Sequence, residues 1–179
     1  MPSGIQVRRI AGALGAEVSG VDLSRPHPAG VADELRRAWL EHLVLFFRGQ
    51  DLTPERYMAF ARGWGTPVEY PFVRGIEGFP EIIEVKKLEH ETVNFGGIWH
   101  SDTAYLDVPP MASMLLAREL PPYGGDTLFA NMYLAYETLS EGLKRTLEGL
   151  RAINSSARAD VTRTREDRIK SGGRPTEKK

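Results

Sequence analysis

The sequence contains no cysteine among its 179 residues. This absence excludes disulfide bonds, thiolate nucleophiles, zinc–thiolate sites and iron–sulfur clusters, because each of them needs cysteine sulfur. It fits a reducing compartment. Any metal ion bound by this chain must therefore be held by nitrogen and oxygen ligands.

Long apolar runs and an excess of one charge are also missing. The longest purely apolar stretch is 43–47 (LVLFF), far short of the roughly 18 to 20 residues that cross a bilayer, and the N-terminus lacks the order of a signal peptide. Twenty-three basic residues balance 24 acidic ones, so no overall field attracts nucleic acid or anionic lipid. We expect a cytoplasmic protein that binds neither nucleic acid nor membranes.

The length and the apolar content indicate one domain. With 179 residues, 41% of them hydrophobic, the chain is long enough for one core and too short for two full domains. We assign residues 1–158 to this domain. Residues 159–179 carry seven basic residues against four acidic ones, with Val161 and Ile169 as the sizeable apolar residues, so we expect a mobile basic segment.

The spacing of apolar residues predicts both helices and strands. Helical spacing runs over 31–42, and Thr53 with Pro54 starts a second helix that should reach about Trp64. Further helices are expected near 132–139 and 141–150, and strands within 5–21 and over 43–47, 81–85, 111–117 and 126–131. Short connections and the number of strands predict an α+β fold with a largely antiparallel sheet and helices outside it.

The stretch 97–105, GIWHSDTAY, places His100 two residues before Asp102. If it is a strand, both side chains face the same way with α-carbons about 6.6 Å apart, close enough to converge on one ion. Two histidines and one carboxylate are the ligand pattern of non-haem iron(II) oxygen chemistry, and this pair supplies two of the three. The same side chains could instead hydrogen-bond one another in a structural role, and the pair alone leaves both interpretations open.

Short motifs on either side of the pair extend the pattern along most of the chain. They are LGAEV (14–18), GVDL (20–23), LFFRGQ (45–50), WHSD (99–102), PP (109–110) and GGDTL (124–128). In this order and spacing they resemble the taurine dioxygenase and chlorophenoxyacetate dioxygenase (TauD/TfdA) family of iron(II)/2-oxoglutarate-dependent oxygenases. The resemblance implies a double-stranded β-helix, or jelly-roll, core with flanking helices.

The resemblance also implies roles for individual residues. His100 and Asp102 would bind Fe(II), and Thr127 would contact a carboxylate of the co-substrate 2-oxoglutarate. The implied reaction uses dioxygen to oxidise a C–H bond of a small anionic substrate and converts 2-oxoglutarate to succinate and CO2. Tyr70 and Asn94 lie where the family places substrate contacts, and the alternative is that both are ordinary loop residues. The histidine and asparagine of taurine-using members are not evident there, which argues against taurine.

The sequence departs from the family in its second half. The family's third iron ligand is a histidine far downstream, followed by an arginine for the distal carboxylate of 2-oxoglutarate, yet no histidine follows His100. We expect an incomplete jelly roll that is unstable and inactive alone. His90 could fold back as a third ligand, whereas His27 suits a loop and His42 a helix surface.

Other interpretations accompany the dioxygenase hypothesis. A non-catalytic jelly-roll remnant or binding module would keep the same residues without turnover, and a hydrolase would use the pair to hold a metal that activates water. Homo-oligomer formation stays open. The aromatic residues Trp99, Phe129 and Tyr133 are expected in the core.

Overall fold

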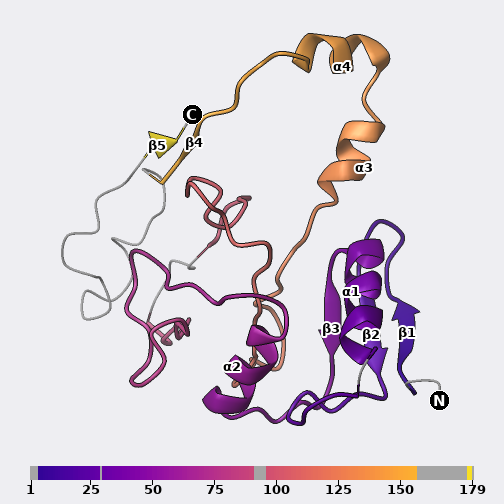
Figure 1. The fold of residues 1–179 in the computed structure, drawn as a ribbon. Helices are drawn as coiled ribbons and strands as arrows, with labels where there is room; N and C mark the ends of the chain where they lie inside the picture. The colour runs from indigo at the N-terminus through magenta and orange to yellow at the C-terminus, as the bar shows by residue number, and fades with distance from the viewer. Residues whose placement is uncertain (1–3, 29, 91–95, 157–176, 179) are drawn as a thin grey trace. The chain divides into compact units, whose positions relative to one another are not determined.

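The computed structural model of the protein describes residues 4–28, 30–90, 96–156 and 177–178 (Figure 1). These residues form two compact units. The first unit takes its described residues from Met1–Gly65 and Leu116–Leu150, and the second from Thr66–Leu115 and Arg151–Lys179. Each unit is considered by itself below.

A three-stranded sheet forms the centre of the first unit, in the order β1-β2-β3. Strands β1 (Gln6–Arg9) and β2 (Ala16–Ser19) are antiparallel, whereas β3 (Leu45–Phe47) runs parallel to β2. Gly20 follows β2 beside the residue that precedes β1. It has φ 79°, and an added Cβ would collide with the carbonyl of Gly4, which favours glycine at this close approach. The strands predicted within 5–21 and 43–47 are confirmed, but the sheet is mixed rather than largely antiparallel.

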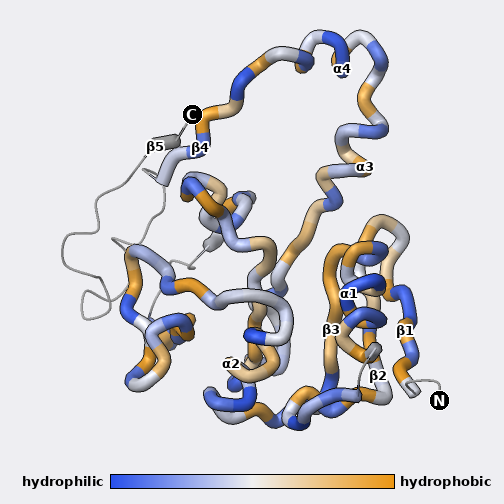
Figure 2. Tube along the Cα trace, viewed as in Figure 1, coloured by the Kyte–Doolittle hydropathy of each residue, from blue (hydrophilic) through white to orange (hydrophobic). Residues whose placement is uncertain are grey.

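Helix α1 (Val31–His42) covers this sheet and buries its apolar stripe. Leu35 is 1% exposed and packs with Val18 and Val31, while the polar residues between them give α1 alternating colours in Figure 2. The helix ends at Leu43, whose φ of 65° is in the left-handed region. This abrupt end lets β3 begin two residues later, so the predicted bounds of α1 are confirmed.

Helix α2 (Pro54–Arg62) begins as its sequence predicts. The Thr53 side chain caps the helix by accepting a hydrogen bond from the Arg56 amide, with proline in the first turn, where its missing N–H costs nothing. The helix ends two residues before Trp64. Phe60 of α2 lies 6.1 Å from Trp64 and 6.2 Å from Phe47 between ring centroids, which joins α2 to the core.

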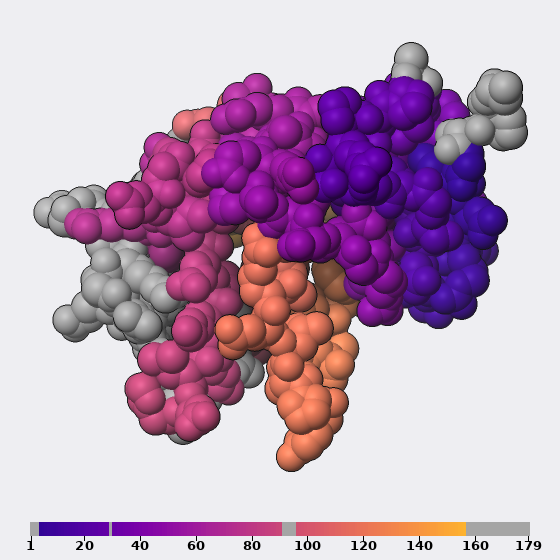
Figure 3. All heavy atoms as spheres, turned by 90° about the horizontal axis from the view of Figure 1, so that it is seen from below, coloured from indigo at the N-terminus to yellow at the C-terminus, as the bar shows by residue number. Residues whose placement is uncertain are grey.

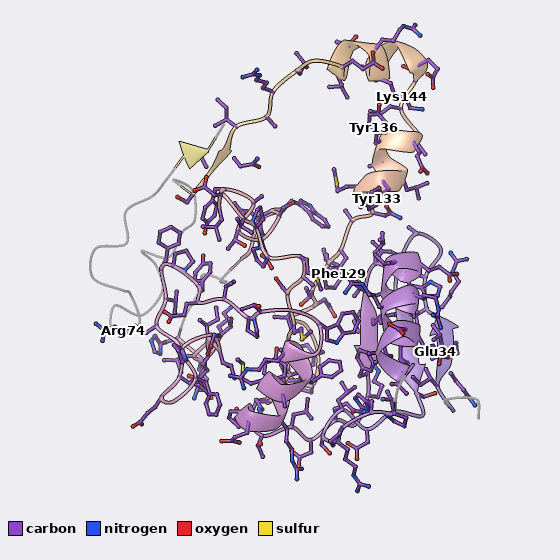
Figure 4. The ribbon with its side chains drawn as sticks, viewed as in Figure 1. Glu34, Arg74, Phe129, Tyr133, Tyr136 and Lys144 are labelled. Carbon is purple, nitrogen blue, oxygen red and sulfur yellow. The ribbon has the colours of Figure 1, made fainter. Side chains whose placement is uncertain are left out.

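Helices α3 (Met132–Glu137) and α4 (Glu141–Leu147) confirm the two later predicted helices, with earlier ends. Neither has a buried residue, and Figure 3 shows the side chains of this segment, in orange, at the surface of the face in view. Phe129 is 45% exposed and Tyr133 is 72% exposed, so their expected core positions are wrong. Phe129 precedes α3, and α3 has no buried residue, so this segment provides no core position for either ring (Figure 4).

The second unit consists mainly of loops. Phe72, Val73 and Tyr105 are its buried hydrophobic residues. Its regular strands are β4 (Asn154–Ser155) and β5 (Glu177–Lys178), which pair antiparallel. The segment 159–179, expected to be mobile, lies outside the described residues except for β5.

Three predicted strands are wrong. Residues 81–85, 111–117 and 126–131 contain no strand, because apolar alternation makes a strand only when a neighbour accepts its backbone hydrogen bonds. Within 81–85, the Ile82 amide instead donates a hydrogen bond to the Phe79 carbonyl, and the Ile82 carbonyl accepts one from the Ile76 amide, in a turn. The described residues therefore show a mixed α and β structure with a partial sheet, as the α+β prediction requires. None of their helices is long and apolar enough to cross a lipid bilayer.

Candidate metal centre

The stretch that contains His100 and Asp102 is a turn and not the strand considered from the sequence. Residues 102–105 form the turn, which is closed by a hydrogen bond of 3.0 Å from the Leu106 amide to the Thr103 carbonyl. Thr103 has φ 48°, a conformation that β-branched residues rarely adopt. The turn brings His100 Nε2 to 3.1 Å from Asp102 Oδ1, so the two side chains converge as expected, from a different backbone.

A backbone carbonyl orients the imidazole of His100. Its Nδ1 lies 2.6 Å from the carbonyl oxygen of Ile98. A carbonyl only accepts hydrogen bonds, so Nδ1 carries the proton, and Nε2 of a neutral ring then presents a lone pair toward Asp102. Metal-binding histidines are commonly held in this way, with the second nitrogen donating to a carbonyl or carboxylate.

The geometry of the pair fits a divalent metal ion. A lone pair on Nε2 and a carboxylate oxygen repel one another at 3.1 Å unless a cation, either a proton or a metal ion, lies between them. Two nitrogen and oxygen donors at right angles, each about 2.1 Å from an ion, are about 3.0 Å apart. The side chains are 47% and 55% exposed, so an ion can reach them.

The second oxygen of Asp102 has its own partner. Ser113 donates a hydrogen bond of 2.6 Å from its hydroxyl to Asp102 Oδ2. Ser113 lies within 111–117, where the sequence predicted a strand with no functional role. No spacing rule in the sequence links a serine to a carboxylate eleven residues earlier, so sequence reasoning missed this contact.

Two tyrosines lie close enough to Asp102 to interact with its charge. Burial, then the neighbouring Tyr70 phenol, then the charge of Asp102 raise the pKa of Tyr105. Burial and the charge of Asp102 also raise the pKa of Tyr70, and the neighbouring Tyr105 phenol partly offsets this. The Phe72 ring packs against both, at 5.8 Å from Tyr70 and 5.9 Å from Tyr105. Tyr70 was expected near the site, and Tyr105, three residues after Asp102, was not singled out.

The remaining residues singled out from the sequence are Thr127, Asn94 and Trp99. Thr127 is exposed and belongs to the first unit, and its contact with 2-oxoglutarate stays a prediction. Asn94 lies outside the described residues. Trp99 is 69% exposed, so its expected core position is wrong, because residues 97–101 form no strand whose second face could be buried.

The other histidines do not complete the site. Within the described part of the chain, which includes all four histidines, no group of three His, Asp or Glu residues could hold a metal ion. His90 therefore does not join His100 and Asp102 as a third ligand. His27 lies in a loop as expected. His42 is only 8% exposed and not on the helix surface, because α1 ends against the hairpin, where His42 accepts a backbone hydrogen bond from Gly15.

The sequence of the chain matches a known family. The model of the family described as "Taurine catabolism dioxygenase TauD, TfdA family" matches residues 6–178. The chain belongs to this family. Its TauD/TfdA membership confirms the resemblance carried by the motifs between LGAEV and GGDTL.

Curated relatives of this TauD/TfdA-family chain support its membership of the family. An alkylsulfatase of Acinetobacter baylyi is 38% identical over 153 residues, which cover 85% of the chain and 47% of the relative. An alpha-ketoglutarate-dependent 2,4-dichlorophenoxyacetate dioxygenase of Cupriavidus pinatubonensis is 34% identical over 76% of the chain and 53% of its own length. The chain spans about half the length of the curated relatives it matches.

Two solved structures are similar to the chain over most of its length and about half of their own. A taurine dioxygenase from Burkholderia xenovorans matches with a TM-score of 0.74 and 37% identity, over 84% of the chain and 54% of that protein. The structure of AAD-2 in complex with Mn(II) and N-oxalylglycine matches with a TM-score of 0.66 and 31% identity, over 84% of the chain and 52% of AAD-2.

Proposed function

We propose that this sequence carries part of the active site of an Fe(II)/2-oxoglutarate-dependent dioxygenase with a double-stranded β-helix core. The reaction oxidises a C–H bond of a small anionic substrate with dioxygen and converts 2-oxoglutarate to succinate and CO2. The observation that carries the proposal is the pairing of His100 Nε2 with Asp102 Oδ1 at 3.1 Å in a TauD/TfdA-family chain.

His100 and Asp102 would hold the metal ion through Nε2 and Oδ1. When bound, Fe(II) supplies the redox chemistry that couples decarboxylation of 2-oxoglutarate to oxidation of the substrate. The similarity to AAD-2, whose structure contains Mn(II) and N-oxalylglycine, supports a divalent ion and a 2-oxo acid at this site, since N-oxalylglycine is 2-oxoglutarate with one methylene replaced by NH. Thr127 would donate its hydroxyl hydrogen to a carboxylate of 2-oxoglutarate.

Two protein ligands do not make a complete iron site. The three-ligand pattern needs a second histidine, and the described residues bring no third donor to the pair. We therefore assign turnover to the form of the protein in which another segment or chain supplies that donor. The missing donor also favours a second candidate, a non-catalytic family member that binds ligands without turnover.

Several relatives support an anionic substrate. Their names include an alpha-ketoglutarate-dependent sulfate ester dioxygenase of Pseudomonas putida and a phenoxypropionate dioxygenase of Sphingobium herbicidovorans. In this chain the half-buried phenol of Tyr70 has a raised pKa, so it stays protonated at neutral pH and can donate a hydrogen bond to a sulfate or carboxylate. The buried Phe72 ring packs against Tyr70, and the buried Tyr105 ring packs against Phe72. Asn94 remains a candidate substrate contact.

The test is oxygen uptake that depends on both Fe(II) and 2-oxoglutarate, with succinate measured as the product. The protein expressed from its own coding sequence would be offered alkyl sulfates, aryloxyacetates and taurine. We expect an alkyl sulfate or an aryloxyacetate to stimulate uptake more than taurine does, His100→Ala to abolish it, and the matched His90→Ala to retain it. Full activity in His100→Ala would remove the site assignment, and ligand binding without uptake would favour the non-catalytic candidate.

A further inference from the structure

The two carboxylate oxygens of Asp102 face different residues. Its Oδ1 faces His100 Nε2 at 3.1 Å, whereas its Oδ2 accepts the Ser113 hydroxyl at 2.6 Å. We propose that Ser113 is a positioning residue that presents Asp102 to the metal through Oδ1 alone. This inference rests on the proposed function, because it concerns the same metal site.

Little else restrains the Asp102 side chain. It is 55% exposed, so packing does not fix its rotation, and a free carboxylate can turn to offer one oxygen or both to an ion. A hydrogen bond from a hydroxyl to an ionised oxygen is short and about twice as strong as one between neutral groups. The Ser113 contact, at 2.6 Å, has the length expected of such a bond. It therefore occupies Oδ2 and leaves Oδ1 to the ion.

The two ligands are thus oriented by separate partners. The Ile98 carbonyl holds the His100 ring through Nδ1, and the Ser113 hydroxyl holds the Asp102 carboxylate through Oδ2. Each partner binds the atom that faces away from the other ligand. Partners of this kind set the direction of the ligand lone pairs, and losing one lowers metal affinity by about 10- to 100-fold.

The backbone between Asp102 and Ser113 explains how the serine returns to the carboxylate. The turn at 102–105 reverses the chain, and Pro109 and Pro110 follow it. Proline fixes its own φ and restricts the residue before it to extended conformations. The paired prolines therefore limit the positions that Ser113 can take, which gives this family motif a role in the metal site.

The inference is tested by Mn(II) binding, followed by electron paramagnetic resonance of the free ion, with Ser113→Ala, Ser113→Thr and the matched control Ser19→Ala. Ser19 is an exposed serine at the end of β2. We expect Ser113→Ala to weaken Mn(II) binding about tenfold or more, Ser113→Thr to restore most of the affinity because it keeps the hydroxyl, and Ser19→Ala to match wild type.

Infrared difference spectra supply a readout that a general loss of folding would not imitate. With isotope-labelled aspartate, the splitting between the two carboxylate stretches distinguishes one-oxygen from two-oxygen coordination. We expect one-oxygen coordination in wild type and Ser113→Thr, and a two-oxygen or mixed signal in Ser113→Ala. Circular dichroism would confirm that the variants keep their secondary structure.

The outcomes separate this inference from the proposed function. Wild-type affinity and an unchanged carboxylate signal in Ser113→Ala would overturn the role of Ser113 and leave the metal site intact. Equal losses in Ser113→Ala and Ser113→Thr would also overturn it, because the hydroxyl would then not be the group that matters. A wild-type protein that binds no Mn(II) would instead remove the proposed function itself.

Discussion

His100 Nε2 and Asp102 Oδ1 meet at 3.1 Å across a turn, with the far side of each group already engaged. Ile98 binds His100 Nδ1, and Ser113 binds Asp102 Oδ2. A nitrogen lone pair and a carboxylate oxygen are therefore directed at one another with no shared proton when the ring is neutral. This arrangement is unfavourable by itself and becomes favourable when a cation is bound.

The raised pKa of Tyr105 predicts its behaviour at high pH. The folded protein keeps this phenolic proton at pH values where the unfolded chain loses it, so the associated stability is present below about pH 10 and falls as the pH rises further. In a titration followed by the ultraviolet absorbance of tyrosinate, we expect Tyr105→Phe to remove a component that ionises late.

The control for that titration is Tyr123→Phe, because Tyr123 is 88% exposed. It should leave the late component in place. If Tyr105→Phe left the late part of the titration unchanged, the burial of Tyr105 beside Tyr70 would be wrong.

The core of the first unit predicts a contrast between two leucines of α1. Leu35 is 1% exposed and Leu40 is 63% exposed. Leu35→Ala should lower the free energy of unfolding by about 2–5 kcal/mol, since it removes buried methyl groups and leaves a cavity. Leu40→Ala should change it by less than about 0.5 kcal/mol.

Thermal denaturation followed by tryptophan fluorescence checks this contrast, because the rings of Trp39 and Trp64 pack 5.7 Å apart in the same unit. Equal shifts of the midpoint in Leu35→Ala and Leu40→Ala would contradict the assigned face of α1.

The exposed apolar residues of the segment 128–153 predict self-association of the 179-residue chain. Leu128, Met132 and Leu150 are 67–70% exposed, and surfaces of this kind drive aggregation when nothing covers them. Size-exclusion chromatography should show oligomers or aggregates. The double variant Leu128→Glu/Met132→Glu should shift the chain toward monomer, whereas Val108→Glu, at an 84% exposed site in the second unit, should shift it less. A wild-type monomer with a cooperative melt would refute this prediction.

Local patterns of the sequence predicted the first third of the fold well. Helix α1 is determined by apolar spacing, and α2 by its Thr53 cap and Pro54, all of which act within a few residues. The strands of the middle region were not predictable in this way. A stretch such as 81–85 has the composition of a strand, but pairing depends on distant partners, and the described residues supply none.

The candidate site shows the same division between local and distant information. The two-residue spacing of His100 and Asp102 predicted that they converge from a strand, whereas the structure brings them together beside a turn. The motifs around them identified the family. Ser113 and Tyr105 were missed because their relation to Asp102 depends on how the turn at 102–105 folds the chain back. That turn contains Thr103 in a left-handed conformation, which propensity rules do not favour for threonine.

The most direct test of the metal site is pulsed electron paramagnetic resonance of the protein at saturating Mn(II), which detects the magnetic coupling of a directly bound imidazole nitrogen. We predict that this coupling is present in wild type and in His90→Ala and absent in His100→Ala. Coupling that persists in His100→Ala, or a wild-type protein that binds no Mn(II) under saturating supply, would contradict metal binding by His100 and Asp102.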